Sequence, residues 1–120
     1  MLKCDMLIDS NDIKSTISKL KSEDNYTVLL DITIIDYLTF PDITPNRFAV
    51  IYILRDQSFK KQISIKSYID DNTLTLDTLC DLYGSANWAE REAYDQYGIN
   101  FKGHPNLKRV LNHHQFVGHP

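Results

Sequence analysis

Residues 47–55 read RFAVIYILR, a run of seven consecutive apolar side chains between two arginines. Successive side chains of a β-strand point to opposite faces of the sheet, so this run places apolar groups on both faces. It therefore predicts a central strand that is covered on both sides. The same run is far shorter than the roughly 20 apolar residues that a membrane-spanning helix needs, so no direct membrane span is expected.

Strand-like patterns flank this run on both sides. Residues 27–37 are rich in β-branched side chains and predict the preceding strand, whereas Pro41 and Pro45 predict a loop over 38–46. A turn over 56–59 leads into 62–68, where apolar and polar residues alternate as in a half-buried hairpin partner. Strict alternation would place the residues of the first strand on two faces: Val28, Leu30, Ile32 and Ile34 on one, and Leu29, Asp31, Thr33 and Ile35 on the other.

A first helix is predicted close to the N-terminus. Ile13, Ile17 and Leu20 recur with helical spacing, and Ser10 or Asn11 can cap the first turn.

Two further helices are predicted after the hairpin. Thr75 can cap a short helix that ends at Gly84, and Leu76, Leu79, Cys80 and Tyr83 would form its buried side. A last helix over 88–97 would begin at Asn87, with Glu90 as the partner of Asn87 in a capping box, and would end at Gly98.

The order of these elements predicts an α+β fold. We expect a two-layer sandwich of helices on a mostly antiparallel sheet, in one domain of 120 residues. Residues 1–98 would form the compact α+β domain, and 99–120, which have no periodicity of their own, an extended C-terminal arm.

Charge and composition exclude several classes of protein. The net charge is -3, and the last 20 residues contain three basic side chains (Lys102, Lys108 and Arg109) and no acidic one. Three cations are too few for a nucleic-acid-binding stripe. Cys4 and Cys80 lack the C-x-x-C spacing of metal sites, and no glycine-rich nucleotide loop or nucleophile motif occurs. Nothing therefore predicts a nucleic acid, nucleotide or covalent catalytic site.

The densest polar cluster lies on the helix over 88–97. Glu92 and Asp95 are three residues apart, and Arg91 can reach Asp95. With His104 these carboxylates could serve a free-standing metal-dependent hydrolase or metal carrier. An ion-paired helix face that fixes the tail or a partner chain is favoured, because the H-E-x-x-H spacing is absent.

The C-terminal residues contain a near repeat, with a G-H-P at 103–105 and again at 118–120, each two residues after a phenylalanine. Glycine permits a positive φ, and the residue before proline favours extended backbone, so each copy predicts a turn. A histidine in such a turn is expected to contact backbone. Aromatic residues also gather between 83 and 101, as either interface or core.

Residues 86–105, ANWAEREAYDQYGINFKGHP, resemble a family signature. Together with Leu107, Arg109, Val110 and Leu111 they are similar to the pattern A-N-W-x-E-R-E-x-x-D-x-x-G-I-x-F-x-G-H-P-x-L-x-R-[IV]-L. That pattern is typical of the 30 kDa subunit family of proton-pumping NADH:quinone oxidoreductase, respiratory complex I. Residues 30–37 and 47–52 resemble two strands of the same family, so the resemblance covers about 30–120.

The resemblance implies a non-catalytic subunit of the peripheral arm, with a structural or assembly role in electron transfer from NADH to quinone coupled to proton translocation. This subunit would bind no cofactor and no metal; NADH, flavin, iron–sulfur clusters and quinone would belong to the whole complex. Its implied partners are the quinone-site subunit, which forms much of the quinone cavity, and neighbouring iron–sulfur subunits. Its implied place is peripheral, on the cytoplasmic face of a bacterial inner membrane or the mitochondrial matrix side. The equivalent subunit of a membrane-bound hydrogenase or a ferredoxin:quinone complex is the alternative.

The resemblance also assigns motif and interface residues. The charged residues of the helix, from Glu90 to Asp95, are expected to hold the geometry of the helix and the tail. Gly98, Gly103 and Pro105 are expected to shape the path by which the chain leaves the domain. Lys108 and Arg109 are expected to contact an acidic surface of a partner. The family continues beyond the second G-H-P, so a chain ending at Pro120 is expected to grip its partner less well. The residues are Trp88, Glu90, Arg91, Glu92, Asp95, Gly98, Phe101, Gly103, His104, Pro105, Lys108 and Arg109.

Overall fold

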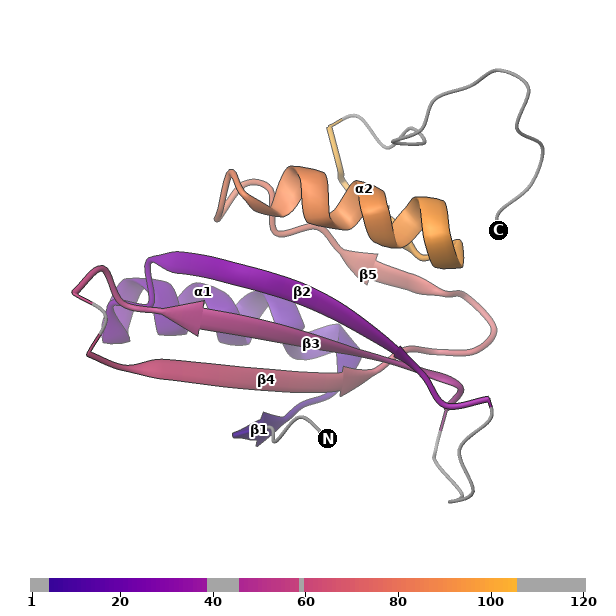
Figure 1. Ribbon diagram of the computed structural model, residues 1–120, viewed down its shortest axis with the longest axis horizontal. Helices are drawn as coiled ribbons and strands as arrows, with labels where there is room; N and C mark the ends of the chain where they lie inside the picture. The colour runs from indigo at the N-terminus through magenta and orange to yellow at the C-terminus, as the bar shows by residue number, and fades with distance from the viewer. Residues whose placement is uncertain (1–4, 39–45, 59, 106–120) are drawn as a thin grey trace.

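A four-stranded sheet forms the centre of the computed structural model, which describes residues 5–38, 46–58 and 60–105 (Figure 1). The strand order is β1–β4–β3–β2, with β2 and β4 antiparallel to β3 and β1 parallel to β4. The sheet is therefore mixed, where a mostly antiparallel one was expected. The bounds are Met6–Leu7 (β1), Val28–Asp36 (β2), Phe48–Arg55 (β3) and Gln62–Tyr68 (β4).

Strand β3 lies in the interior of the sheet, as its sequence predicts. Phe48, Val50, Tyr52 and Leu54 belong to the main core cluster on one face of the sheet. The alternate residues Ala49 and Ile51 are also buried. Both faces of β3 are thus covered, which explains why its sequence shows no alternation of polar and apolar residues.

Strand β2 contains a bulge that the sequence pattern did not reveal. Leu29 pairs with Leu54 and Asp31 with Ile53, so Leu30 has no partner in the register. Leu29 is consequently buried, whereas the side chain of Leu30 is 45% exposed. The predicted faces of this strand are wrong before the bulge, because one extra residue reverses the alternation of side chains.

Helix α1 (Ile13–Asp24) buries Ile13 and Ile17 completely, as their spacing predicts. It follows a short 3-10 turn, η1 (Ser10–Asp12). The predicted cap is wrong: the side chain of Asp9 accepts the hydrogen bond, at 2.9 Å, from the backbone N–H of Asn11. The chain enters the helix through an extra turn, so the capping position lies earlier than Ser10.

The helix predicted to begin at Thr75 is wrong. Strand β5 (Thr75–Asp77) occupies its first residues and pairs in parallel with β6 (Asn100–Lys102), where Leu76 lies opposite Phe101. Turns follow β5, and Leu79 and Tyr83 are buried there without a helix. The helical spacing of these apolar residues was therefore misleading, because their burial depends on pairing with a distant segment.

Helix α2 (Ala86–Tyr97) ends as predicted at Gly98, which has a left-handed φ of 73° and donates its backbone N–H to the carbonyl of Tyr94. Gly84 lies just before this helix and does not stop an earlier one. Ser85 precedes the first turn without a side-chain cap, and its hydroxyl donates to the carbonyl of Leu29 in β2 at 3.1 Å.

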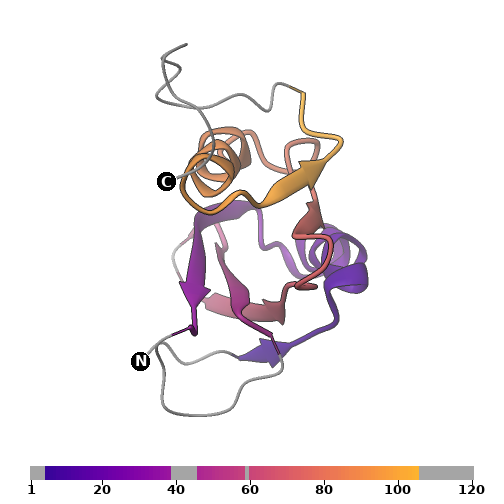
Figure 2. The same ribbon diagram turned by 90° about the vertical axis from the view of Figure 1, so that its right-hand side faces the viewer.

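The layers enclose one core. Helix α1 covers one face of the four-stranded sheet, and α2 packs beside β2 with β5 and β6 next to it (Figure 2). The fold is thus α+β, as expected, with a second, two-stranded parallel sheet. Strand β6 belongs to the segment 99–120 that was expected to form the arm; residues 106–120 lie outside the described residues.

Candidate functional site

Glu90 is a fully buried carboxylate on α2. Its oxygens accept hydrogen bonds from the hydroxyl of Thr78 at 2.5 Å and from the backbone N–H of Leu79 at 2.8 Å. Burial raises the pKa of Glu90, against the opposing effect of these donors. The predicted capping box with Asn87 is therefore wrong, because this carboxylate turns inward and binds the turn after β5.

His104 lies close to the same carboxylate. Its Nε2 atom is 3.9 Å from Oε1 of Glu90 and 3.2 Å from the carbonyl oxygen of Asn87, and its side chain is completely buried. The expected contact with backbone is confirmed. Glu90 and His104 together bring the turn after β5, helix α2 and the turn after β6 to one point.

Gly103 makes this close approach possible. Its φ is +86°, and a Cβ atom there would lie 3.3 Å from Cγ2 of Thr78. The turn predicted for the first G-H-P is therefore confirmed for a steric and a conformational reason. The second G-H-P, at 118–120, lies outside the described residues.

The outer side of α2 presents a different surface. The side chain of Trp88 is 54% exposed, and the guanidinium of Arg91 lies 5.5 Å from the centre of the Trp88 ring. The Nε atom of Arg91 is buried and has no hydrogen-bond partner among the described residues. Trp88 thus presents a large apolar surface with a cation held against it.

The remaining acidic residues of the motif differ in environment. Glu92 is exposed and lines a shallow groove between α2 and β2, whereas Asp95 is buried. The two carboxylates, expected to share one face, therefore do not form one acidic surface. Among the motif residues, Lys108 and Arg109 lie outside the described part of the chain.

The described residues bring together one group of three possible metal ligands, Cys80, Glu90 and His104, whose ligand atoms all lie within 4.8 Å of one another. The alternative set of Glu92, Asp95 and His104 is not assembled there. Sequence reasoning missed the role of Cys80 beside Glu90, because the turn after β5 brings them together across ten residues.

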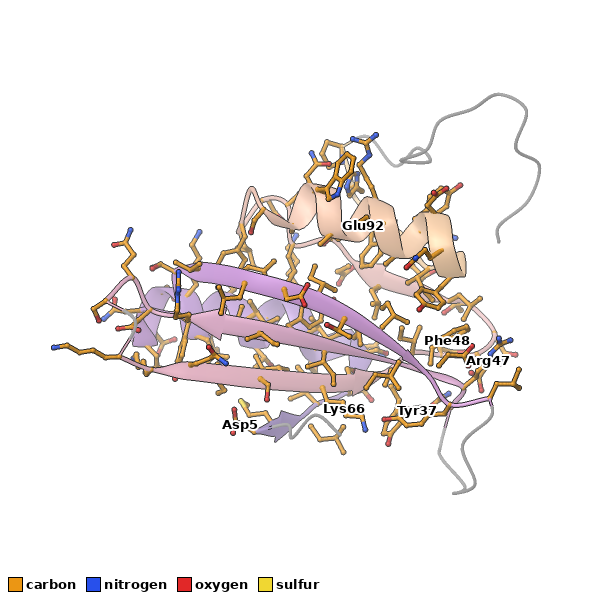
Figure 3. All side chains as sticks on the ribbon, in the orientation of Figure 1. Asp5, Tyr37, Arg47, Phe48, Lys66 and Glu92 are labelled. Atoms are coloured by element: carbon orange, nitrogen blue, oxygen red, sulfur yellow. The ribbon has the colours of Figure 1, made fainter. Side chains whose placement is uncertain are left out.

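A second polar cluster lies on the four-stranded sheet, away from α2. Lys66 donates to the hydroxyl of Tyr37 at 2.7 Å, and its Nζ atom lies 4.8 Å from the ring centre of Tyr68. Burial lowers the pKa of Lys66, but the two tyrosines outweigh it, so the net shift is upward. Figure 3 shows Lys66 and Tyr37 close together on the sheet, well separated from Glu92. No motif pointed to this cluster.

A family model matches residues 6–120 of this chain and is described as the 30 kDa subunit of respiratory-chain NADH dehydrogenase. Two relatives, each named as the C subunit of NADH-quinone oxidoreductase, are similar over nearly the whole chain. The one from Geotalea uraniireducens (strain Rf4) is 38% identical over 96% of this chain and 68% of its own length. The one from Francisella tularensis subsp. novicida (strain U112) is 37% identical over 93% of this chain and 64% of its own length. The chain thus spans about two thirds of the length of these relatives.

Two solved structures are similar to this chain. A trypsin-resistant fragment of Nqo5 is 38% identical with a TM-score of 0.77, and the match covers 84% of this chain and 80% of the fragment. A chain of a membrane-bound sulfane sulfur reductase, an archaeal respiratory membrane complex, is 22% identical with a TM-score of 0.72, covering 88% of this chain and 59% of that one. The second likeness shows the fold alone.

Proposed function

Because the chain belongs to the 30 kDa subunit family of respiratory-chain NADH dehydrogenase, also called NADH-quinone oxidoreductase or complex I, we propose that it is a non-catalytic peripheral-arm subunit of that complex. Its role is to hold neighbouring subunits together beside the quinone-site subunit. The electron transfer from NADH to quinone, coupled to proton translocation, belongs to the assembled complex.

The observation that carries this role is the exposed Trp88 with Arg91 against it on α2. Tryptophan and arginine are enriched in protein interfaces and among the residues that dominate binding energy. Because 54% of the Trp88 side chain is exposed to water, its apolar surface contributes little to the stability of the isolated domain. A partner that covers this ring would remove its apolar surface from solvent and leave the cation at the rim. We therefore assign Trp88 and Arg91 to the contact with the quinone-site subunit.

The buried side of α2 supports this surface from behind. Glu90 fixes the helix to the turn after β5, and His104 lies against the same helix just before Pro105. The direction in which the chain leaves the domain is thereby tied to the helix that carries Trp88. Residues 106–120 would then act as the arm, with Lys108 and Arg109 meeting an acidic surface of the same partner.

The cofactors and location of the whole complex follow from this assignment. NADH, flavin, iron–sulfur clusters and quinone would be bound by other subunits of the complex, among them the quinone-site subunit and the neighbouring iron–sulfur subunits. Among the described residues no helix is long and apolar enough to cross a membrane. We propose a peripheral place, on the cytoplasmic face of a bacterial inner membrane or the matrix side in mitochondria.

The test is co-purification of the quinone-site subunit with single Trp88→Ala and Arg91→Ala variants of this chain. Both should keep the thermal unfolding midpoint of the wild type within a few degrees, because neither Trp88 nor Arg91 belongs to the buried core. Both should recover at least about tenfold less partner, as expected for a residue that dominates an interface.

Gln96→Ala is the matched control, since Gln96 is an exposed residue of the same helix. It should assemble like the wild type. Unchanged recovery of the partner with both the Trp88 and Arg91 variants would show that this face is not the interface. An Arg91→Ala, Glu92→Ala double variant then measures whether the charged pair adds to the effect.

A further inference from the structure

We propose that Cys80, Glu90 and His104 form a binding site for a divalent transition metal of the zinc class. A thiolate, a carboxylate and an imidazole nitrogen are the ligand types that Zn²⁺ takes in proteins. Neither the family resemblance nor the proposed interface assigns a metal to this chain, so the site departs from the expectation that the subunit binds none.

The distances between the three ligand atoms are near those of a zinc tetrahedron. Zinc–ligand bonds of about 2.0–2.3 Å place neighbouring ligand atoms of a tetrahedron about 3.3–3.8 Å apart. Sγ of Cys80 lies 3.5 Å from Oε1 of Glu90, and Nε2 of His104 lies 3.9 Å from the same oxygen. All three atoms lie within 4.8 Å of one another, so the imidazole would have to move closer to the other two ligand atoms to complete the set.

The carboxylate is already held in a fixed direction. Thr78 and Leu79 donate to its two oxygens, and such outer hydrogen bonds are typical of ligands that a protein orients for a metal. A thiolate and a carboxylate together carry two negative charges, which a divalent cation neutralises. This compensation favours the ionised form of a carboxylate that burial otherwise disfavours.

Metal ions can reach the site from solvent through Cys80. The side chains of Glu90 and His104 are fully buried, whereas Cys80 is half-buried and lines a surface depression with Thr78 and Gly103. Lys14, on the rim of this depression, is engaged by Asp81 at 2.8 Å, which offsets its repulsion of a cation. The fourth coordination position would face this opening and take a water molecule.

Binding is balanced by the release of protons and requires no redox step. In the metal-free protein Nε2 of His104 donates to the carbonyl of Asn87. On binding, the hydrogen bond from Nε2 to Asn87 is given up: the Nε2 proton leaves to solvent, and the neutral imidazole takes up a proton on Nδ1 instead, which frees the Nε2 lone pair for the metal. Cys80 loses its thiol proton to solvent, so the net release is one proton. The metal would then cross-link the turn after β5, helix α2 and the turn after β6.

The experiment titrates the reduced full chain with Co²⁺, followed by displacement with Zn²⁺. The wild type should give a thiolate-to-cobalt charge-transfer absorption that saturates at one equivalent and disappears when Zn²⁺ is added. Cys80→Ser should lose this absorption, and His104→Gln should weaken the affinity at least about tenfold. In parallel, Zn²⁺ should raise the thermal unfolding midpoint of the wild type but not that of Cys80→Ser.

Two controls separate this site from other ligands in the chain. Cys4→Ser should keep the charge-transfer absorption, and so should a variant with His113, His114 and His119 all changed to alanine. Circular dichroism shows whether each variant is folded. The proposal is overturned if the wild type gives no charge-transfer absorption, or if that absorption survives Cys80→Ser or is lost in Cys4→Ser.

Discussion

Two buried tyrosines show how differently the same side chain can contribute to stability. The hydroxyl of Tyr83 donates to the carbonyl of Tyr26 at 2.6 Å, and burial raises its pKa to about 12. The hydroxyl of Tyr52 on β3 is completely buried and has no hydrogen-bond partner among the described residues. A buried hydroxyl without a partner costs free energy that a buried ring alone does not.

We predict that Tyr52→Phe leaves the free energy of unfolding unchanged or raises it by up to about 1 kcal/mol. Tyr83→Phe, the matched control, should lower it by about 1 kcal/mol, because it leaves the carbonyl of Tyr26 without its donor. Denaturant unfolding of both variants measures the difference. A loss of more than about 1 kcal/mol in Tyr52→Phe would mean that its hydroxyl has a bound partner, such as an ordered water molecule.

At the scale of the elements, two glycines lie near the ends of α2: Gly84 before its first turn and Gly98 directly after its last residue. Gly98 has a positive φ of 73° and closes the helix, whereas Gly84 has an ordinary φ and open space where a Cβ atom would lie. We expect Gly98→Ala to lower the free energy of unfolding by about 1–2 kcal/mol, the cost of a left-handed alanine. Gly84→Ala should change it by less than about 0.5 kcal/mol. Equal effects in thermal or denaturant unfolding would contradict a special role for the helix end.

Some elements of this fold are predictable from local sequence patterns, and others are not. Three features could be predicted from the sequence: the core residues of β3, the buried apolar residues of α1 and the end of α2. Each depends on a pattern among residues that are close together in the sequence. Strand β5 could not be predicted, since Leu76 is buried by pairing with Phe101, 25 residues later. Nor could the bulge at Leu30, because an extra residue leaves no local signature in an apolar strand.

The candidate site illustrates the same limit at a larger distance. Trp88 and Arg91 are neighbours on one helix, so the sequence could predict that they lie together. Cys80 and His104 come from turns on either side of α2 and meet Glu90 only because β5 and β6 pair. The G-H-P motif predicted the turn at Gly103 and a backbone contact for His104, but not that this histidine would lie beside the carboxylate of Glu90.

In the whole molecule, the hydrophobic core includes residues that follow the C-terminal end of α2. Ile99 and Phe101 are fully or almost fully buried, and β6 is tied to β5 by hydrogen bonds from Asn100 to Leu74 at 2.8 Å and from Thr78 to Lys102 at 3.0 Å. Each of the two apolar side chains contributes about 1.5–3 kcal/mol by its burial. Their sum is a large fraction of the roughly 5–15 kcal/mol that holds a typical domain together.

We therefore predict opposite results for two truncations. A chain ending at residue 98 should lose cooperative thermal unfolding, because it lacks Ile99, Phe101 and the strand that covers β5. A chain ending at 105 should keep its unfolding midpoint within a few degrees of the full chain, yet recover less of the quinone-site subunit, because the proposed arm begins at 106. Cooperative unfolding of the 1–98 chain would show that β6 is dispensable for the fold. Full partner recovery by the 1–105 chain would show that the arm is not part of the proposed interface. The contact with the partner would then rest on the face around Trp88 alone.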